Sequence, residues 1–278
     1  ISAELDAAVI TFVKQEKFTG TILVARKGEI LLHKAYGQKN DEAGQPNTVN
    51  SIYQIASLAK QFTAAVILKL QEQGKLSVKD KVSKYYPGYP NCDKITIHHL
   101  LSHTSGIYNY SDNKAFMAGD QSQPVTLDSM IRLFNNQPLV FEPGSRFSYS
   151  NSGYTLLGYI IEKVTGKSYH PVLNKLILKP LHLRHSGYDY LALKDSNKTT
   201  GYLQYGSGGF TKANPVHPSI LYTTGALYST TGDLYKWHQA LMGNRFLSAA
   251  SIQLLYTPYS GRYGYGWQID SLYNKKRV

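Results

Sequence analysis

The first 36 residues change from helical to strand periodicity, and this change limits the folds open to the chain. Behind Ser2, which suits a helix cap, apolar residues recur at helical spacing: Leu5, Ala8, Val9, Phe12 and Val13. Two β-rich runs, 19–25 and 30–36, then flank a turn at Lys27 and Gly28. The pattern predicts a helix packed on an antiparallel hairpin.

The middle of the chain has mainly helical periodicity. An apolar stripe begins after Ser57 and stops at Gly74, and further helices are predicted over 94–103, 126–136, 152–165 and 170–179. The polar stretch 37–50 predicts a loop. Sheet character returns at 225–229 and, after a helix over 231–241, at 263–267, where two glycines permit close backbone approach.

This order of elements predicts an α+β fold, in which an antiparallel sheet is flanked by helices and joined to a mainly helical subdomain. Residues 1–50 and 215–278 are expected to form the sheet subdomain, and residues 51–214 the helical one. The chain opens at Ile1 without an initiator Met, which favours a mature or trimmed product.

The composition excludes several classes of protein. Lys and Arg outnumber Asp and Glu by 30 to 18, yet charged residues make up only 17%, and no recognised binding motif accompanies the excess. We therefore expect a solvated basic surface and no nucleic-acid partner. No apolar run reaches the roughly 18 residues of a membrane span, so no transmembrane segment is predicted. The single cysteine, Cys92, excludes an intrachain disulfide and lacks a catalytic context.

A serine and a lysine at the start of a predicted helix form the most informative motif. Ser57 and Lys60 share one helix face, which brings a hydroxyl and an amine together. A serine becomes a good nucleophile when a base lies within hydrogen-bond reach, and burial can lower the pKa of a lysine enough for that role. The same Ser-x-x-Lys spacing occurs at Ser111 and Lys114, in a polar segment without apolar periodicity.

A second motif, Tyr149-Ser150-Asn151, lies just before a strongly apolar helical stretch. A tyrosine beside a lysine and a serine can relay a proton from nucleophile to leaving group, and the amide of an asparagine can hold a substrate carbonyl. The alternative is that these residues only cap the helix.

Together these motifs resemble the serine β-lactamase and penicillin-binding-protein superfamily, in the branch that contains class C β-lactamases, D-alanyl-D-alanine carboxypeptidases and related serine esterases. The resemblance covers segments along nearly the whole chain: 18–37, 57–74, 100–106, 143–166, 225–237 and 263–267. It implies a β-lactamase/transpeptidase-like fold with Ser57 as nucleophile, Lys60 as base, Tyr149 as their partner and Asn151 as a substrate-binding residue. The backbone amide of Ser57 would form half of the oxyanion hole.

The resemblance also implies a reaction and a location. We expect hydrolysis of a small-molecule or peptidoglycan-peptide substrate through an acyl-enzyme, on a β-lactam, D-Ala-D-Ala peptide or ester carbonyl, without a metal or organic cofactor. The family's usual substrates indicate a periplasmic or secreted protein. The alternative is a non-catalytic penicillin-binding or scaffold protein with the same fold.

Two features depart from the family pattern. Ser111-Asp112-Asn113 copies the second motif of class A enzymes, but its surroundings favour a loop turn. The third motif, Lys or His, then Thr or Ser, then Gly, is not found after 263–267, and His185-Ser186-Gly187 and Thr104-Ser105-Gly106 occur at other landmarks. We therefore expect additional polypeptide to complete the sheet.

Histidine pairs and a glycine-rich run complete the candidates. His99 with His103, and His182 with His185, have spacings that zinc sites use, but no Cys, Asp or Glu stands at a fitting interval, so no metal site is predicted. The run 205–209 is a weak match to a phosphate cradle and is better interpreted as a loop over the cleft.

Overall fold

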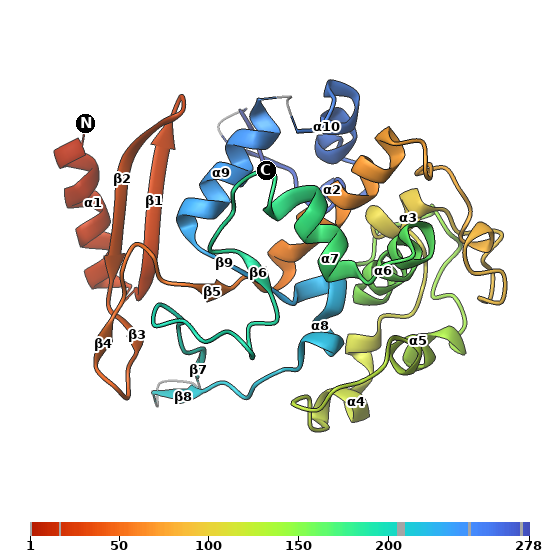
Figure 1. Ribbon diagram of the computed structural model, residues 1–278, viewed down its shortest axis with the longest axis horizontal. Coiled ribbons are helices and arrows are strands. Elements are labelled where there is room, and N and C mark those ends of the chain that lie inside the picture. The colour runs from red at the N-terminus through yellow and green to blue at the C-terminus, as the bar shows by residue number, and fades with distance from the viewer. Residues whose placement is uncertain (1, 17, 205–208, 244–245, 273–274) are drawn as a thin grey trace.

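The computed structural model describes residues 1–278 except 1, 17, 205–208, 244–245 and 273–274 (Figure 1). Most of the glycine-rich run 205–209 therefore lies outside the described residues. Helices and short antiparallel strands together make an α+β fold, as predicted.

The N-terminal helix and hairpin form as the sequence predicts. α1 (Ser2–Gln15) packs on β2 (Glu29–Tyr36), which pairs antiparallel with β1 (Gly20–Arg26) from Gly20 opposite Tyr36 to Arg26 opposite Glu29. On the other side of the hairpin, α9 (Thr231–Met242) lies against β1 (Figure 1). Chain segments about 200 residues apart thus cover the two sides of one hairpin.

Small sheets connect this hairpin to the rest of the molecule. The prediction of a loop over 37–50 is wrong in one respect, because this segment contains the short hairpin of β3 (Gln38–Asn40) and β4 (Gln45–Pro46). The central strand of a three-stranded sheet is β9 (Leu227–Ser229), which pairs with β5 (Tyr53–Gln54) and β6 (Gly187–Tyr188). A further hairpin consists of β7 (Tyr202–Gln204) and β8 (Phe210–Lys212).

The main hydrophobic core surrounds α2 (Ala59–Glu72), in which every residue from 59 to 68 is buried. α6 (Asn151–Thr165) and α8 (Pro218–Gly225) pack directly on it, while α3 (Ile97–Leu101) packs on α6 (Figure 1). The remaining helices lie around these elements: α4 (Lys114–Ala118), α5 (Leu127–Asn135), α7 (Tyr169–Leu173) with a π-helical continuation over Asn174–Leu178, and α10 (Ala249–Tyr256). In the part of the chain that the structure describes, no helix is long and apolar enough to cross a membrane.

Local chemistry explains why two predicted elements are shorter or displaced. The helix predicted over 94–103 begins only after Thr96, whose side chain caps it in a reciprocal bond with His99, and it ends before His103, whose φ is +57°. The strand predicted over 263–267 is a turn closed by a bridge between Tyr263 and Gln268.

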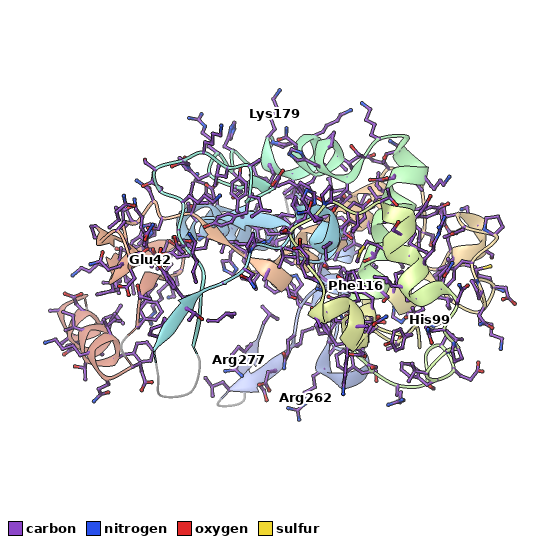
Figure 2. All side chains as sticks on the ribbon, turned by 90° about the horizontal axis from the view of Figure 1, so that it is seen from below. Glu42, His99, Phe116, Lys179, Arg262 and Arg277 are labelled. Carbon is purple, nitrogen blue, oxygen red and sulfur yellow. The ribbon has the colours of Figure 1, made fainter. Side chains whose placement is uncertain are left out.

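The strand itself, β10 (Asp270–Leu272), follows this turn and pairs with β11 (Lys275–Arg277). Asp270 forms ion pairs with Arg262 and Arg277, which are labelled close to each other near the lower edge of Figure 2. The two arginines thus link the turn and the second strand to the start of the first.

The glycines of this turn do allow the close approach that the sequence predicts. Gly266, with φ +80°, lies so near α2 that a Cβ atom would fall 2.8 Å from the backbone of Gln61 and from the carbonyl of Lys60. Gly264 is equally confined, since a Cβ there would lie 2.1 Å from the carbonyl of Leu255. The turn is therefore packed directly against the first turns of the central helix.

We expect Gly266→Ala to lower the free energy of unfolding by about 1–3 kcal/mol more than Gly44→Ala, because the added methyl overpacks the contact with α2. Gly44 is a matched control: its φ is +58°, but no atom lies within 4 Å of the point that a Cβ would occupy there. Urea unfolding of both variants makes the comparison. Equal losses would show that strain at positive φ, and not contact with α2, accounts for the effect.

Candidate active site

Ser57 is displayed at a sharp bend before the central helix. It lies in a 3-10 turn, Ala56–Leu58, that runs into α2, and its side chain is exposed. Ala56, which precedes it, has φ +44°, a left-handed value that a residue with a Cβ rarely adopts. The bend presents the hydroxyl of Ser57 while the helix that follows stays buried.

Lys60 occupies the position that the Ser-x-x-Lys motif predicts. Its side chain is fully buried, and its Nζ donates to Ser57 Oγ at 3.2 Å and to the backbone carbonyl of Thr224 at 3.0 Å. Burial lowers the pKa of the ammonium to about 7. An appreciable fraction of Lys60 is therefore neutral near pH 7 and able to accept a proton.

Tyr149 also contacts the serine hydroxyl. Its hydroxyl donates to Ser57 Oγ at 2.8 Å, and its ring centroid is 4.9 Å from Lys60 Nζ. Burial raises the pKa of the phenol, although the bond to Ser57 opposes this shift. The phenol is thus protonated at neutral pH, so it serves here as a proton donor while Lys60 is the group able to act as base.

Asn151 is near this trio but is bonded elsewhere. It is the first residue of α6, which Ser150 caps, and its side-chain amide donates to Ser111 Oγ at 2.7 Å. Among the described residues, no hydrogen bond joins Asn151 to Ser57 or Lys60. The structure therefore brings Ser57, Lys60 and Tyr149 together and ties Asn151 to the class A-like segment.

Thr224 is the participant that the sequence did not reveal. Its carbonyl is aimed at Lys60 by a distorted turn inside α8, where Tyr222 has φ 36° and ψ −123°. The hydroxyl of Tyr222 donates to Glu162 at 2.7 Å, and its ring lies so close to Gly158 that a Cβ there would be 2.2 Å away. The sequence signal of this close packing is Gly158, a glycine inside the apolar stretch 152–165.

The remaining candidates have structural contacts. Ser111 lies in a 3-10 turn, Tyr110–Asp112, and accepts the bond from Asn151. His99 Nδ1 accepts from the amide of Thr96 at 3.3 Å, and the thiol of Cys92 is directed at the carbonyl of Pro87. The described residues contain no cluster of three or more metal-ligating side chains.

The chain belongs to the Beta-lactamase family, which matches residues 5–274. It is 32% identical over 300 residues to penicillin-binding protein 4* of Bacillus subtilis (strain 168), covering 96% of this chain and 63% of that protein. A penicillin-binding protein structure from Bacillus halodurans gives a TM-score of 0.86 at 30% identity, covering 96% and 84% of the two chains. A D-stereospecific amidohydrolase from Streptomyces sp. gives 0.74 at 29% identity, covering 80% and 72%.

These similarities confirm the predicted superfamily and fold class. The chain spans less than two thirds of the length of curated relatives that it matches, 63% of one and 64% of another.

We expect the rate at which Ser57 reacts with a fluorophosphonate to rise about tenfold per pH unit below pH 7 and to level off above it. The reason is that only the neutral amine of Lys60, whose pKa is about 7, can take the proton of Ser57. Intact-mass measurements of labelling between about pH 5 and pH 9 give the profile.

Two variants sharpen this test. Lys60→Ala should be slow and lack the inflection near pH 7, whereas Lys75→Ala, at an exposed position just after α2, should keep the wild-type profile. A wild-type rate that does not change across this range would contradict the assignment of Lys60 as base.

Proposed function

We propose that this protein is a serine hydrolase that cleaves amide or β-lactam carbonyls through an acyl-enzyme on Ser57. One observation carries the proposal: a single exposed hydroxyl accepts hydrogen bonds from both Lys60 and Tyr149. A base and an acid within hydrogen-bond reach of one nucleophile are the elements that acyl transfer requires.

The geometry supports the following sequence of steps. Neutral Lys60 takes the proton of Ser57 as Oγ bonds to the substrate carbonyl carbon, giving a tetrahedral oxyanion. The bond to the leaving group then breaks, and the leaving nitrogen takes a proton from Tyr149, which Lys60 replaces. Water attacks the resulting ester and loses a proton to Lys60. The bond between Ser57 Oγ and the carbonyl carbon then breaks, Oγ takes that proton back from Lys60, and the carboxylic acid leaves.

The backbone of Ser57 and the side chain of Asn151 have separate proposed roles in holding the substrate. We assign one donor to the backbone amide of Ser57, in the turn that leads into α2, where amides at a helix start favour negative charge. Asn151 remains the proposed contact for the substrate carbonyl, which requires its amide to exchange Ser111 for substrate.

The relatives guide the proposed substrate. One is named for penicillin binding and another for D-stereospecific amide hydrolysis, which favours β-lactams and peptides ending in D-amino acids over simple esters. A peptidoglycan-type peptide would place the protein in the periplasm or outside the cell. Parallel assays with a chromogenic cephalosporin, a D-Ala-D-Ala peptide and a p-nitrophenyl ester rank the three substrate classes. Stoichiometric acylation by penicillin without turnover would instead favour a penicillin-binding role.

We expect Ser57 to be the one residue acylated by penicillin or by a fluorophosphonate, because among the described residues it alone bonds both Lys60 and Tyr149. Peptide mapping by mass spectrometry locates the label. Ser57→Ala should abolish it, and Ser111→Ala, the matched control from the other Ser-x-x-Lys pair, should retain it. Label on Ser111, or undiminished labelling of Ser57→Ala, would overturn the proposal.

We also propose that further polypeptide completes the sheet along β1. In the described part of the chain, β1 pairs only with β2, and a cavity of about 720 Å³ is lined by residues of β1 and α9 and by Phe12 of α1. The apolar face of α1 is poorly covered, since Ile10 is 38% and Phe12 49% exposed. An edge of this kind is a template for another strand, and the exposed apolar side chains favour an apolar partner surface.

Without such polypeptide, we expect the 278-residue chain to associate in solution as its concentration rises, because the β1 edge and the α1 face remain accessible. Light scattering with intact-mass measurement tests this. A monodisperse 31.1 kDa monomer that is folded and acylated on Ser57 would contradict the proposal.

A further inference from the structure

His103 is a buried polar residue beside the site that the steps above do not use. Its exposed fraction is 1%, and its Nε2 has no hydrogen-bond partner among the described residues. It follows α3, with a φ of +57° that side chains with a Cβ seldom adopt. A buried imidazole held in an unfavourable backbone conformation, with an unsatisfied ring nitrogen, calls for an explanation.

The hydrogen bonds of His103 hold the two residues that flank Tyr149 in the sequence. The backbone carbonyl of His103 accepts from the amide of Ser148 at 2.9 Å, and its ring Nδ1 accepts from the amide of Ser150 at 3.1 Å. Tyr149 lies between those two serines. One residue of the α3 end thus fixes the backbone on both sides of the tyrosine that bonds Ser57.

The imidazole also packs on the tyrosine ring. The centroids of His103 and Tyr149 are 4.4 Å apart, and Tyr154 at 5.0 Å and Tyr263 at 4.7 Å surround the imidazole from α6 and from the turn before β10. Aromatic contacts at these distances restrict the ring as well as the backbone. They leave Tyr149 little freedom to turn away from Ser57.

We propose that His103 is a positioning residue that holds the phenol of Tyr149 in place for proton transfer at Ser57. The inference rests on the proposed function, because it matters only if Tyr149 takes part in acylation. It assigns His103 no contact with substrate and no proton transfer of its own.

The role requires a neutral ring. Nδ1 can accept the amide proton of Ser150 only when it carries no proton, so the remaining proton is on Nε2. Burial, together with the nearby charge of Lys60, lowers the pKa of His103 well below its usual value, in keeping with this form. A neutral ring also avoids a second positive charge next to Lys60.

The test distinguishes two contributions of His103: the Nδ1 acceptor and the packing of its ring. In His103→Asn, Oδ1 branches from Cγ much as Nδ1 does, and asparagine tolerates positive φ better than most residues, so the acceptor is kept and the ring is lost. His103→Gly removes both without straining the backbone. Each variant is made in the wild-type and Tyr149→Phe backgrounds, and the rate of fluorophosphonate labelling of Ser57 is measured together with thermal unfolding. His182→Asn, at an exposed histidine with φ +52°, is the control for substitution at positive φ.

We expect His103→Gly to react about 10²-fold more slowly than wild type, as for a catalytic group displaced by about 1 Å, and His103→Asn to stay within about threefold. In the Tyr149→Phe background, the two variants should react at equal rates, since the group that His103 positions is gone. Should His103→Gly fail to fold, His103→Phe, which keeps a ring and offers no acceptor, replaces it in the same comparison. A folded His103→Asn that is about 10²-fold slow in the wild-type background, and slower by the same factor in the Tyr149→Phe background, would overturn the proposal.

Failure of this inference differs from failure of the proposed function. If wild-type protein is not labelled on Ser57, the proposed function fails. If wild type is labelled but His103→Gly is as fast, or its loss persists unchanged in Tyr149→Phe, then His103 does not act through Tyr149 and the proposed function stands. Tyr149→Phe with a wild-type rate would likewise overturn the positioning role.

Discussion

Two carbonyl groups of α8 face the central helix, and the arrangement around Lys60 depends on them. The carbonyl of Thr224 accepts from Lys60 and that of Thr223 accepts from Thr63, one turn further along α2. Both point inward because the backbone is distorted at Tyr222, whose hydroxyl is bonded to Glu162. Backbone strain of this kind costs about 1–3 kcal/mol and persists only where the surroundings enforce it.

The surroundings that enforce this strain connect the core to the site. Glu162 accepts both the hydroxyl of Tyr222 and the backbone amide of Tyr169, and the hydroxyl of Tyr169 in turn bonds Thr63. Three helices and the distorted turn are thereby joined through buried and half-buried polar groups that are each paired. Such networks specify one arrangement more sharply than apolar packing does, because an unpaired member is costly.

Sequence reasoning identified the parts of the site that are encoded locally. The spacing of Ser57 and Lys60 is a property of one helix, and Tyr149 precedes an apolar helix whose cap is legible from the sequence. The carbonyl of Thr224 and the ring of His103 reach the site from segments distant in the chain, through backbone conformations at positive φ that no spacing predicts. The hairpin was predictable from two β-rich runs and the turn between them, whereas the exposed face of α1 depends on what packs against it.

The buried amine of Lys60 has a thermodynamic consequence for the whole fold. An ordinary lysine titrates near pH 10.5, and this one near 7, so between those values the unfolded chain binds a proton that the native state does not. The conformational stability contributed by this group therefore increases with pH across that window and is lowest below it, where the native state must hold a buried charge. The buried amine that gives Ser57 a base therefore lowers the free energy of unfolding below that window, by an amount of the order of several kcal/mol. The packing of α2 against α6 and α8 has to offset it.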